Sequence, residues 1–398
     1  MGTTPSIDYD PTSPHVQADP YPYYARLREH APLQWNEHIH AWVVSRHPDV
    51  VEMLRDSRWS SNYIGRGVDL ALRKKLDIQR LGQVLLFMDA PDHTKLRRAV
   101  SKGFESTRLA QLAVYTRATA TQMLDDFRGR DEVDLISEFA APLSLRVLAR
   151  LLGVPDSDLS VIEDSAHDLS RLVDWTPSVE ALDGVRKRAA ILAPYLRNLI
   201  EHKRREPGDD LISTLIEQIR QHKMRYVDII STTILLLAAG HVTSTHMIGN
   251  GVLALLKDPK ALEECRSERY PMVRVVEELL RYDSPVQATP RSALEDIELH
   301  GQVIRRGEIG LALLGSANRD PSAFVEPDRI DPGRRNVFAL SFGSGPHFCI
   351  GAELGRATGA IALEFLLGRY PNLRLTDQVL KWTPTVTQHG LTALRVAL

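Results

Sequence analysis

The sequence contains little cysteine. Its 398 residues include two cysteines, Cys265 and Cys349, which lie far apart in the chain. Two cysteines are too few for a disulfide framework or for a zinc site made of several cysteines. The composition is typical of a protein in a reducing compartment.

The sequence also lacks an excess of one charge. It has 49 Lys and Arg residues against 51 Asp and Glu residues, so its net charge is −2 with the histidines neutral. This balance argues against a nucleic-acid partner and against a basic membrane-binding surface over the whole molecule. It does not exclude a local basic patch.

Long hydrophobic runs are missing as well. The longest, Ile234–Gly240, is too short to cross a bilayer. Residues Met1–Pro20 are polar and lack the basic and apolar regions of a signal peptide. These features predict a cytoplasmic protein with no membrane span.

What is present is material for a large, mainly helical core, because 43% of the residues are hydrophobic and 25% charged. Apolar residues at three- and four-residue spacing predict helices at Leu109–Phe127, Ser144–Leu152, Val185–Arg205, Met224–Lys257 and Pro271–Arg281. The strand candidates are Ala41–Ser45, Ile297–Ile309 and Thr383–Val396. We expect one α-rich domain over residues 1–398, with a small β region and a loop at Glu201–Asp210.

The segment Phe342–Gly351 (FGSGPHFCIG) is the most informative stretch. Gly343, Gly345 and Gly351 surround Cys349, and the residues that follow are expected to form a helix. Glycines let backbone N–H groups point at the sulfur and let a flat ligand approach closely. A helix N-terminus lowers the pKa of a nearby thiol. A thiolate ligand of haem iron has these requirements.

Other interpretations of this segment remain open on its own residues. A lone cysteine in a glycine-rich loop is more often a small buried hydrophobe. A phosphate-binding loop fits poorly, because the G-x-G-x-x-G pattern would need glycine at Phe348 and no clear strand precedes it.

Several motifs, in one order along the chain, resemble the bacterial soluble cytochrome P-450 family. Phe342–Gly351 is similar to its F-x-x-G-x-H-x-C-x-G haem loop, and Glu278–Arg281 to its E-x-x-R helix. Ala239–Thr243 resembles its oxygen-activation segment. The resemblance extends to Asp89–Arg97, Asn318–Pro321 and Pro327–Arg329, and it covers nearly the whole chain.

The resemblance implies a mainly α cytochrome P-450 fold, a large helical body with a small β-rich region, that binds haem b (iron protoporphyrin IX). It implies that Cys349 is the axial ligand of the iron. Phe342 would shield the loop from water, the amides around Gly343 would tune the sulfur, and Gly351 would leave room beneath the macrocycle.

The two haem propionates need cationic or hydrogen-bonding partners. His93 and Arg97 are four residues apart, so a helix places them on one face. Without the haem loop, a solvated charge pair would be the preferred interpretation. With it, propionate binding is favoured, and the resemblance adds Arg291 and His347 as further partners.

Glu278 and Arg281 are three residues apart and can pair on a helix. The resemblance implies a buried network with Arg329 that holds the cysteine loop. Its expected role is structural.

The segment Ala239–Thr243 also carries the main departure from the family. There, a small pair such as Ala239 and Gly240 lets oxygen and substrate approach the iron, and an acid followed by threonine delivers protons. Here Thr243 is kept, but Val242 occupies the acid position and cannot relay a proton. Protons are expected to arrive through Thr243 with water, from the substrate or from another polar group.

Several reaction classes fit these features. The favoured one is a haem-thiolate monooxygenase acting on a secondary metabolite. The alternatives are oxidative aryl or phenol coupling of an aromatic or peptidic substrate without oxygen insertion, a peroxide-driven enzyme, and a haem-binding protein without turnover.

By the same resemblance, substrate contacts are expected from Ser60–Leu86, Asp164–Asp183, Ala238, Val242, Gln287, Ala288, Thr289 and Gln388. Charged residues in the first two segments suggest a polar, anionic, peptidic or carrier-tethered substrate, although a solvated lid is the preferred interpretation. Because the chain ends soon after its last strand, electrons are expected from a separate ferredoxin or flavodoxin with its reductase. That partner would dock on a basic face with Lys95, Arg98 and Arg356.

Overall fold

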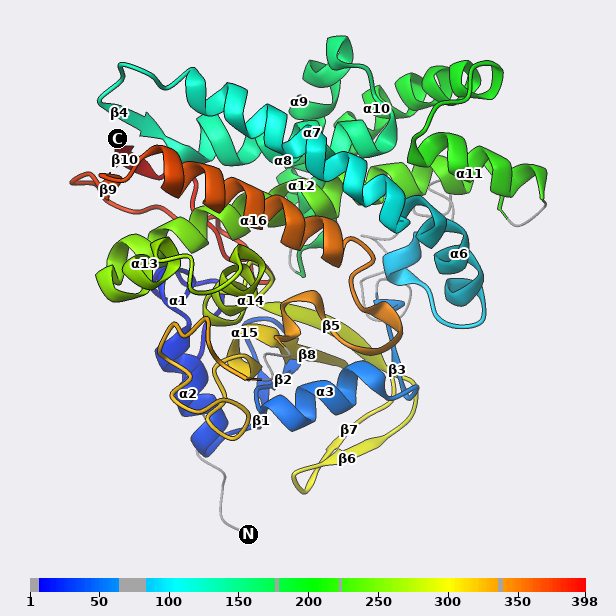
Figure 1. Ribbon diagram of the computed structural model, residues 1–398. Helices are drawn as coiled ribbons and strands as arrows, with labels where there is room; N and C mark the ends of the chain where they lie inside the picture. Colours follow the sequence, from blue (N-terminus) through cyan, green and yellow to red (C-terminus); the bar gives the residue numbers. More distant parts are fainter. Residues whose placement is uncertain (1–6, 64–83, 176–178, 222–223, 336–338) are drawn as a thin grey trace.

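Helices build the larger part of the molecule, and a sheet-rich region lies below them in the view of Figure 1. The computed structural model describes residues 7–63, 84–175, 179–221, 224–335 and 339–398. The expected mainly α fold with a small β region is confirmed.

The long central helix α12 (Tyr226–Lys257) runs through the helical body. It is apolar on nearly all sides, a pattern typical of a helix buried all round. It packs against the helices on every side of it: α8 (Ala141–Leu152), α9 (Leu159–Leu169), α14 (Met272–Tyr282) and α16 (Ala352–Arg369). By length and composition it is the one described helix that could span a membrane, but 61% of its most apolar window is buried in protein. It is the core helix.

The other described α-helices lie around this core or beside the main sheet (Figure 1). They are α1 (Pro14–Ala18), α2 (Tyr21–His30), α3 (His47–Arg55), α6 (Asp92–Ser101), α7 (Ser106–Asp125), α10 (Val179–Arg205), α11 (Leu211–Arg220), α13 (Pro259–Arg266) and α15 (Leu314–Ala317). All five helices expected from apolar spacing are confirmed, with ends that differ by a few residues. The expected loop at Glu201–Asp210 is shorter in the structure: α10 continues to Arg205, and residues 206–210 connect it to α11. Asp210 caps α11 by accepting from the Ser213 amide.

The main sheet has the strand order β1-β2-β8-β5-β3. Its strands are β1 (Leu33–Asn36), β2 (Ala41–Val44), β8 (Ile309–Leu313), β5 (Ala288–Ala293) and β3 (Trp59–Ser60). Strands β2 and β8 are parallel and all other neighbours are antiparallel.

Two smaller sheets complete the β region. One pairs β6 (Ile297–Leu299) with β7 (Gln302–Ile304), and the other has the order β4 (Glu132–Asp134), β10 (Arg395–Ala397), β9 (Arg374–Leu375). The expected strand Thr383–Val396 was wrong over most of its length. Before β10 this segment makes turns and two isolated bridges, because Pro384 and Gly390 interrupt any continuous ladder.

A buried ion-pair network joins α14 to the segment that follows α15. Arg281 donates Nε and Nη2 to the two carboxylate oxygens of Glu278, at 2.8 Å each. It also donates to the backbone carbonyls of Asn318, Pro327 and Arg329. Glu278 and Arg281 are both fully buried, so these bonds replace all their contacts with water.

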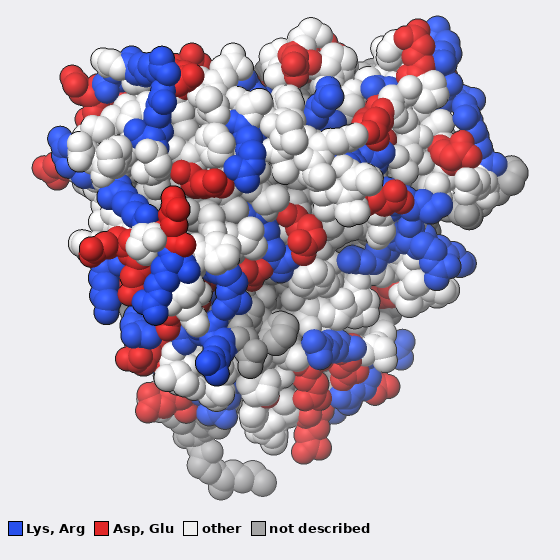
Figure 2. Space-filling view, in the orientation of Figure 1, with Lys and Arg blue, Asp and Glu red and all other residues white. Residues whose placement is uncertain are grey.

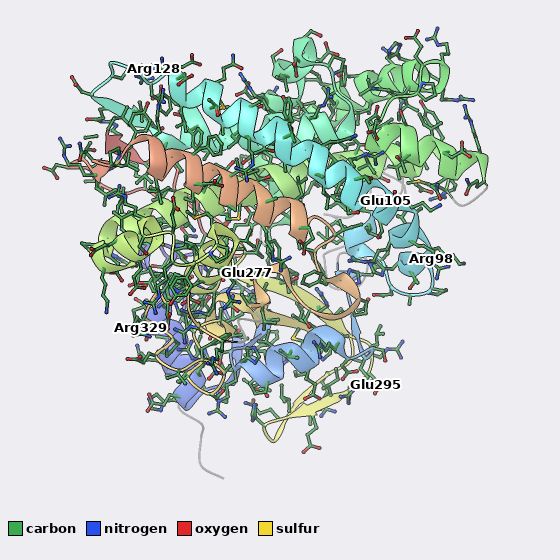
Figure 3. All side chains as sticks on the ribbon, viewed as in Figure 1. Arg98, Glu105, Arg128, Glu277, Glu295 and Arg329 are labelled. Carbon is green, nitrogen blue, oxygen red and sulfur yellow. The ribbon has the colours of Figure 1, made fainter. Side chains whose placement is uncertain are left out.

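The predicted role of the Arg329 side chain in this network was wrong. That side chain is 52% exposed, pairs with Asp331 and points to the surface (Figure 3). The second guanidinium beside Glu278 belongs to Arg334, which is 8% exposed and 3.3 Å away. Arg329 takes part through its carbonyl alone, because its side chain leaves the segment on the solvent side.

The network predicts unequal effects of two substitutions. Glu278→Gln removes the charge between two buried guanidinium groups and should lower the free energy of unfolding by about 3–5 kcal/mol. Arg329→Ala removes an exposed ion pair and should cost less than about 1 kcal/mol. Urea unfolding of both variants tests this, and equal losses would contradict the placement of the Arg329 side chain outside the buried network.

Candidate functional site

The cysteine loop is a tight turn that begins in the sheet-rich region and ends at α16. Gly343 and Gly345 have φ of +72° and +70°, which glycine adopts without strain. A Cβ on Gly345 would lie 2.6 Å from the carbonyl oxygen of Leu54, so this position also needs the space. The Cys349 amide donates to the Phe342 carbonyl at 2.9 Å and closes the loop. The loop conformation explains its glycine content.

Cys349 is exposed to the two cavities described below, although protein atoms lie close around its sulfur. Burial raises the pKa of this thiol, while the Gly351 amide and the guanidinium groups of Arg97 and Arg356 act in the opposite direction. The lowered thiol pKa expected from the helix N-terminus is therefore outweighed by desolvation. A bound cation at the sulfur would reverse that balance.

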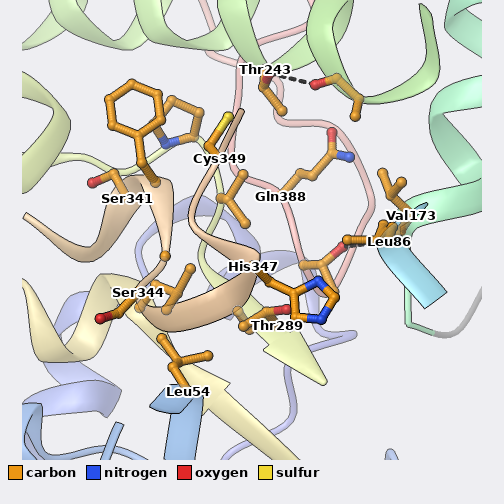
Figure 4. Close-up of a pocket in the computed structure, with 18 of the residues that line it drawn as sticks. Leu54, Leu86, Val173, Thr243, Thr289, Ser341, Ser344, His347, Cys349 and Gln388 are labelled. Atoms are coloured by element: carbon orange, nitrogen blue, oxygen red, sulfur yellow. Dashed lines mark hydrogen bonds between the residues drawn. The ribbon is translucent and has the colours of Figure 1, made fainter. Parts of the chain in front are cut away.

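Two connected cavities, of about 220 and 270 Å³, meet at Cys349. Both are lined by Ala239 and Thr243 of α12, by Phe342 and by His347. Figure 4 shows Cys349, Thr243, His347 and Gln388 projecting into this space from different parts of the chain. Most of the remaining lining is apolar, including Leu54, Tyr63, Leu86, Val173, Met247, Val286 and Leu314.

Basic groups gather at one edge of these cavities. The rings of His93 and His347 lie 4.0 Å apart, and Arg97 and Arg291 flank them. Burial, together with these cations, lowers the pKa of His347 to about 3, and burial lowers the pKa of Arg291 to about 10. The pKa of His93 is lowered too, first by burial and then by Arg97. All four predicted propionate partners therefore lie together.

This cluster is incomplete without an anion. In the described part of the chain, neither Arg97 nor Arg291 forms an ion pair, and the buried His93 Nε2 has no hydrogen-bond partner. Arg291 donates to Thr289 Oγ1 and the Pro290 carbonyl, which leave its charge uncompensated. A flat group that carries two carboxylates could pair with the basic cluster and also reach the Cys349 sulfur. The residues present fit haem.

Only one face of the central helix reaches the cavities. Ala239, Gly240 and Thr243 line them, and the Thr243 hydroxyl donates to the Ala239 carbonyl at 2.7 Å. Ala238 and Val242 are buried and line neither cavity. Each residue turns a helix by about 100°, which places these two beside the lining face. Their predicted contact with substrate was wrong.

The predicted substrate residues outside α12 divide in the same way. Ala288, Thr289 and Gln388 line the cavity. Gln287 does not, because its side-chain amide turns away to donate to the Ser284 carbonyl and the Tyr21 hydroxyl.

Among the charged residues expected over the cavity, Arg171 and Asp174 lie in the described part of the chain, and both contact protein. Arg171 donates to the Pro384 carbonyl, and Asp174 accepts from the backbone of the same C-terminal segment. The prediction from Ser60–Leu86 falls largely outside the described residues. Tyr63 and Leu86, at its two ends, line the cavity. Val173, which lies inside the expected segment Asp164–Asp183, lines the cavity as well. Met247 also lines it but belongs to no short motif, because its position depends on contacts between distant segments.

The face that carries α6 and α16 has basic residues over α6 (Figure 2). Arg98 is exposed and makes no ion pair among the described residues. Lys95 is exposed beside Asp92 at 3.4 Å. Arg356 is mostly buried and pairs with Glu277 and Glu353, so its expected role as a free surface cation was wrong. Arg97 ties α6 to the cysteine loop by donating to the Phe348 carbonyl at 2.6 Å.

Residues 165–388 match the family model described as "Cytochrome P450". The chain is 37% identical over 388 residues to "Cytochrome P450 107B1" of Saccharopolyspora erythraea, covering 94% of this chain and 93% of that protein. It is also similar to P450BioI, crystallised with an acyl carrier protein bearing hexadec-9Z-enoic acid. That structure has a TM-score of 0.90 and 34% identity, and the match covers 97% of this chain and 100% of that one.

A third relative is PksS, described as the cytochrome P450 of the bacillaene polyketide synthase of Bacillus subtilis 168. Its structure gives a TM-score of 0.89 at 30% identity, with 98% of this chain and 99% of that chain covered. The family model and these nearly full-length relatives agree with the cysteine loop, the basic cluster and the fold. The chain therefore belongs to the cytochrome P450 family, whose members are monooxygenases that use haem b.

Proposed function

We propose that this protein inserts one oxygen atom into a mainly apolar substrate that binds in the cavity beside Cys349. The observation that carries the proposal is the position of Cys349, which faces an apolar cavity whose opposite wall bears Thr243. Haem b, when bound, supplies the activation of oxygen. We assign this chemistry to one catalytic domain over residues 1–398, working in the cytoplasm.

Each part of the site has a proposed task. Cys349 binds the iron, and Phe342 and the loop around Gly343 and Gly351 shield and orient its sulfur. His93, Arg97, Arg291 and His347 hold the two propionates, with charge from the arginines and neutral hydrogen bonds from the imidazoles.

Thr243 is the proposed group for proton delivery. Its hydroxyl proton is engaged by the Ala239 carbonyl, so its oxygen is presented to the cavity as an acceptor for water. A water that donates one hydrogen to Thr243 Oγ1 has its second hydrogen available for a group in the cavity, and solvent water would replace the proton it gives up. This route needs no acid at Val242, which lies off the cavity. Gly240 lines the cavity without a side chain, so this part of α12 leaves space for a ligand.

The cavity favours an apolar substrate over a polar one, because its walls are mostly apolar and because Arg171 and Asp174 bond to protein. The relatives support two candidates. PksS is described as part of a polyketide synthase, which fits a secondary metabolite. P450BioI is described with a fatty acid on a carrier protein, which fits a carrier-tethered acyl chain.

Bacterial members of the family take electrons from ferredoxin-type partners and their reductases. We propose such a separate partner for this chain, docking on α6 beside the cysteine loop, where Arg98 is exposed. Opposite charges at an interface rim speed association and are screened by salt.

The first prediction concerns the iron ligand. Haem-loaded Cys349→Ser should lose the thiolate-type spectrum of the reduced carbon-monoxide complex, because an alcohol cannot supply the sulfur ligand. Cys265→Ser is the matched control and should keep it, since Cys265 is buried in α13 away from both cavities. A thiolate spectrum that survives in Cys349→Ser would overturn the proposed function.

The second prediction concerns proton delivery and reaction type. The wild-type product should gain one oxygen atom, whereas a loss of two hydrogens would favour aryl or phenol coupling.

Thr243→Val should lower product per electron pair about ten-fold or more and raise peroxide release. Thr245→Val should change neither, because Thr245 makes the same bond to the His241 carbonyl but does not line the cavities. Equal effects of both substitutions would contradict the role of Thr243.

The third prediction concerns the electron partner. The rate of reduction by an acidic ferredoxin should fall several-fold between low and high ionic strength. Arg98→Glu should slow reduction at low salt, whereas Arg128→Glu at the far end of α7 should not (Figure 3). If the rate of reduction is the same at low and high ionic strength and in both variants, docking at α6 is ruled out.

A further inference from the structure

Two segments far apart in the sequence close the cavity together. The roof segment, Ser170–Trp175, contributes Val173 to the lining, and the C-terminal turn, Pro384–Gln388, contributes Thr387 and Gln388. Figure 4 shows Val173 and Gln388 next to each other in the cavity wall. Their relative position therefore sets the shape of the space above Cys349.

Asp174 connects the two segments. Its side chain is almost fully buried, and Oδ1 accepts four hydrogen bonds. One comes from the Trp175 amide at 2.9 Å within the roof segment. The other three come from the C-terminal turn: the amides of Val386 and Thr387 at 3.2 and 3.3 Å, and the Thr387 hydroxyl at 3.1 Å.

Neighbouring bonds strengthen the same junction. The Thr387 hydroxyl also lies 3.3 Å from the Val173 carbonyl, and Arg171 donates to the Pro384 carbonyl at 3.2 Å. Trp175 donates to the Ile39 carbonyl at 3.1 Å, and its ring packs edge-on against Tyr63, which lines the cavity. The roof is thus bonded to two other parts of the chain.

Burying the Asp174 carboxylate at this junction is energetically unfavourable unless hydrogen bonds satisfy it. Burial raises the pKa of Asp174, and the bonds from Thr387, Trp175 and Val386 oppose that rise. A buried acceptor is tolerated when donors satisfy it, and here three of the four donors belong to the opposite segment. Removing the Asp174 carboxylate would leave the amides of Val386 and Thr387 without their acceptor. The C-terminal turn would then separate from the roof segment or rearrange.

We propose that Asp174 is a positioning residue that sets the binding of bulky ligands by fastening the roof segment to the C-terminal turn. Small ligands of the iron, which need not reach the roof, are independent of this contact. The proposal rests on the proposed function, since it takes the cavity above Cys349 to be the ligand-binding space.

Imidazole and 4-phenylimidazole serve as probes on the haem-loaded protein. Both bind iron through the same nitrogen, but only the second extends an apolar ring into the cavity. Asp174→Ala should weaken 4-phenylimidazole about ten-fold and speed its dissociation, while imidazole affinity stays within about two-fold. Asp174→Asn keeps a neutral acceptor oxygen and should restore wild-type affinity for both probes.

Asp134→Ala is the matched control. Asp134 Oδ1 accepts from the Leu394 amide at 2.7 Å and the Ile136 amide at 3.1 Å, so it also fastens the C-terminal segment to a distant element. It lines neither cavity. This variant should lose stability without changing the affinity ratio of the two probes. Thr387→Val, which removes one donor, should give a smaller shift than Asp174→Ala and covers the case in which that variant does not fold.

The outcomes separate the two proposals. If wild-type protein gives no spectral shift with imidazole, the haem site itself is wrong and the proposed function fails. If imidazole binds but the affinity ratio is the same in wild type, Asp174→Ala and Thr387→Val, the role of Asp174 is overturned. If Asp134→Ala changes the ratio as much as Asp174→Ala, the effect is general loss of stability and the proposal also fails.

Discussion

The buried guanidinium of Arg281 is the interaction on which the rest of the site depends. It sits where α14, the segment after α15 and the approach to the cysteine loop meet, and it bonds to carbonyls of that segment and to Glu278. Asn318, whose carbonyl Arg281 holds, bonds in turn to the Leu340 amide and the Ser341 hydroxyl. A buried charge has few alternative arrangements, because any broken contact leaves it uncompensated. The cysteine loop is thereby held in one place.

The cavity has opposite requirements at its edge and at its centre. At the edge, Arg97 and Arg291 concentrate positive charge in a desolvated space, and the pKa of His347 is lowered first by burial and then by these charges. At the centre the walls are apolar. A flat group with two carboxylates on one side meets both requirements. The positive charges that repel one another at the edge would therefore favour the binding of haem.

Much of the site could be predicted from the sequence wherever a short pattern fixes local geometry. The cysteine loop is such a case, since Gly343 and Gly345 require positive φ within a few residues of Cys349. The lining face of α12 could also have been predicted, because helix rotation places Val242 away from Thr243. The position of Arg334 beside Glu278 and the bonds of Asp174 could not, because each joins segments far apart in the chain and neither belongs to a local pattern.

The central claim is that the Cys349 sulfur binds the iron. X-ray absorption at the iron edge of the haem-loaded protein tests it most directly, because sulfur and lighter neighbours scatter differently. We predict one sulfur neighbour in the wild type and in Cys265→Ala, and none in Cys349→Ala. An iron surrounded only by nitrogen and oxygen in the wild type, or a sulfur neighbour that persists in Cys349→Ala, would contradict the account.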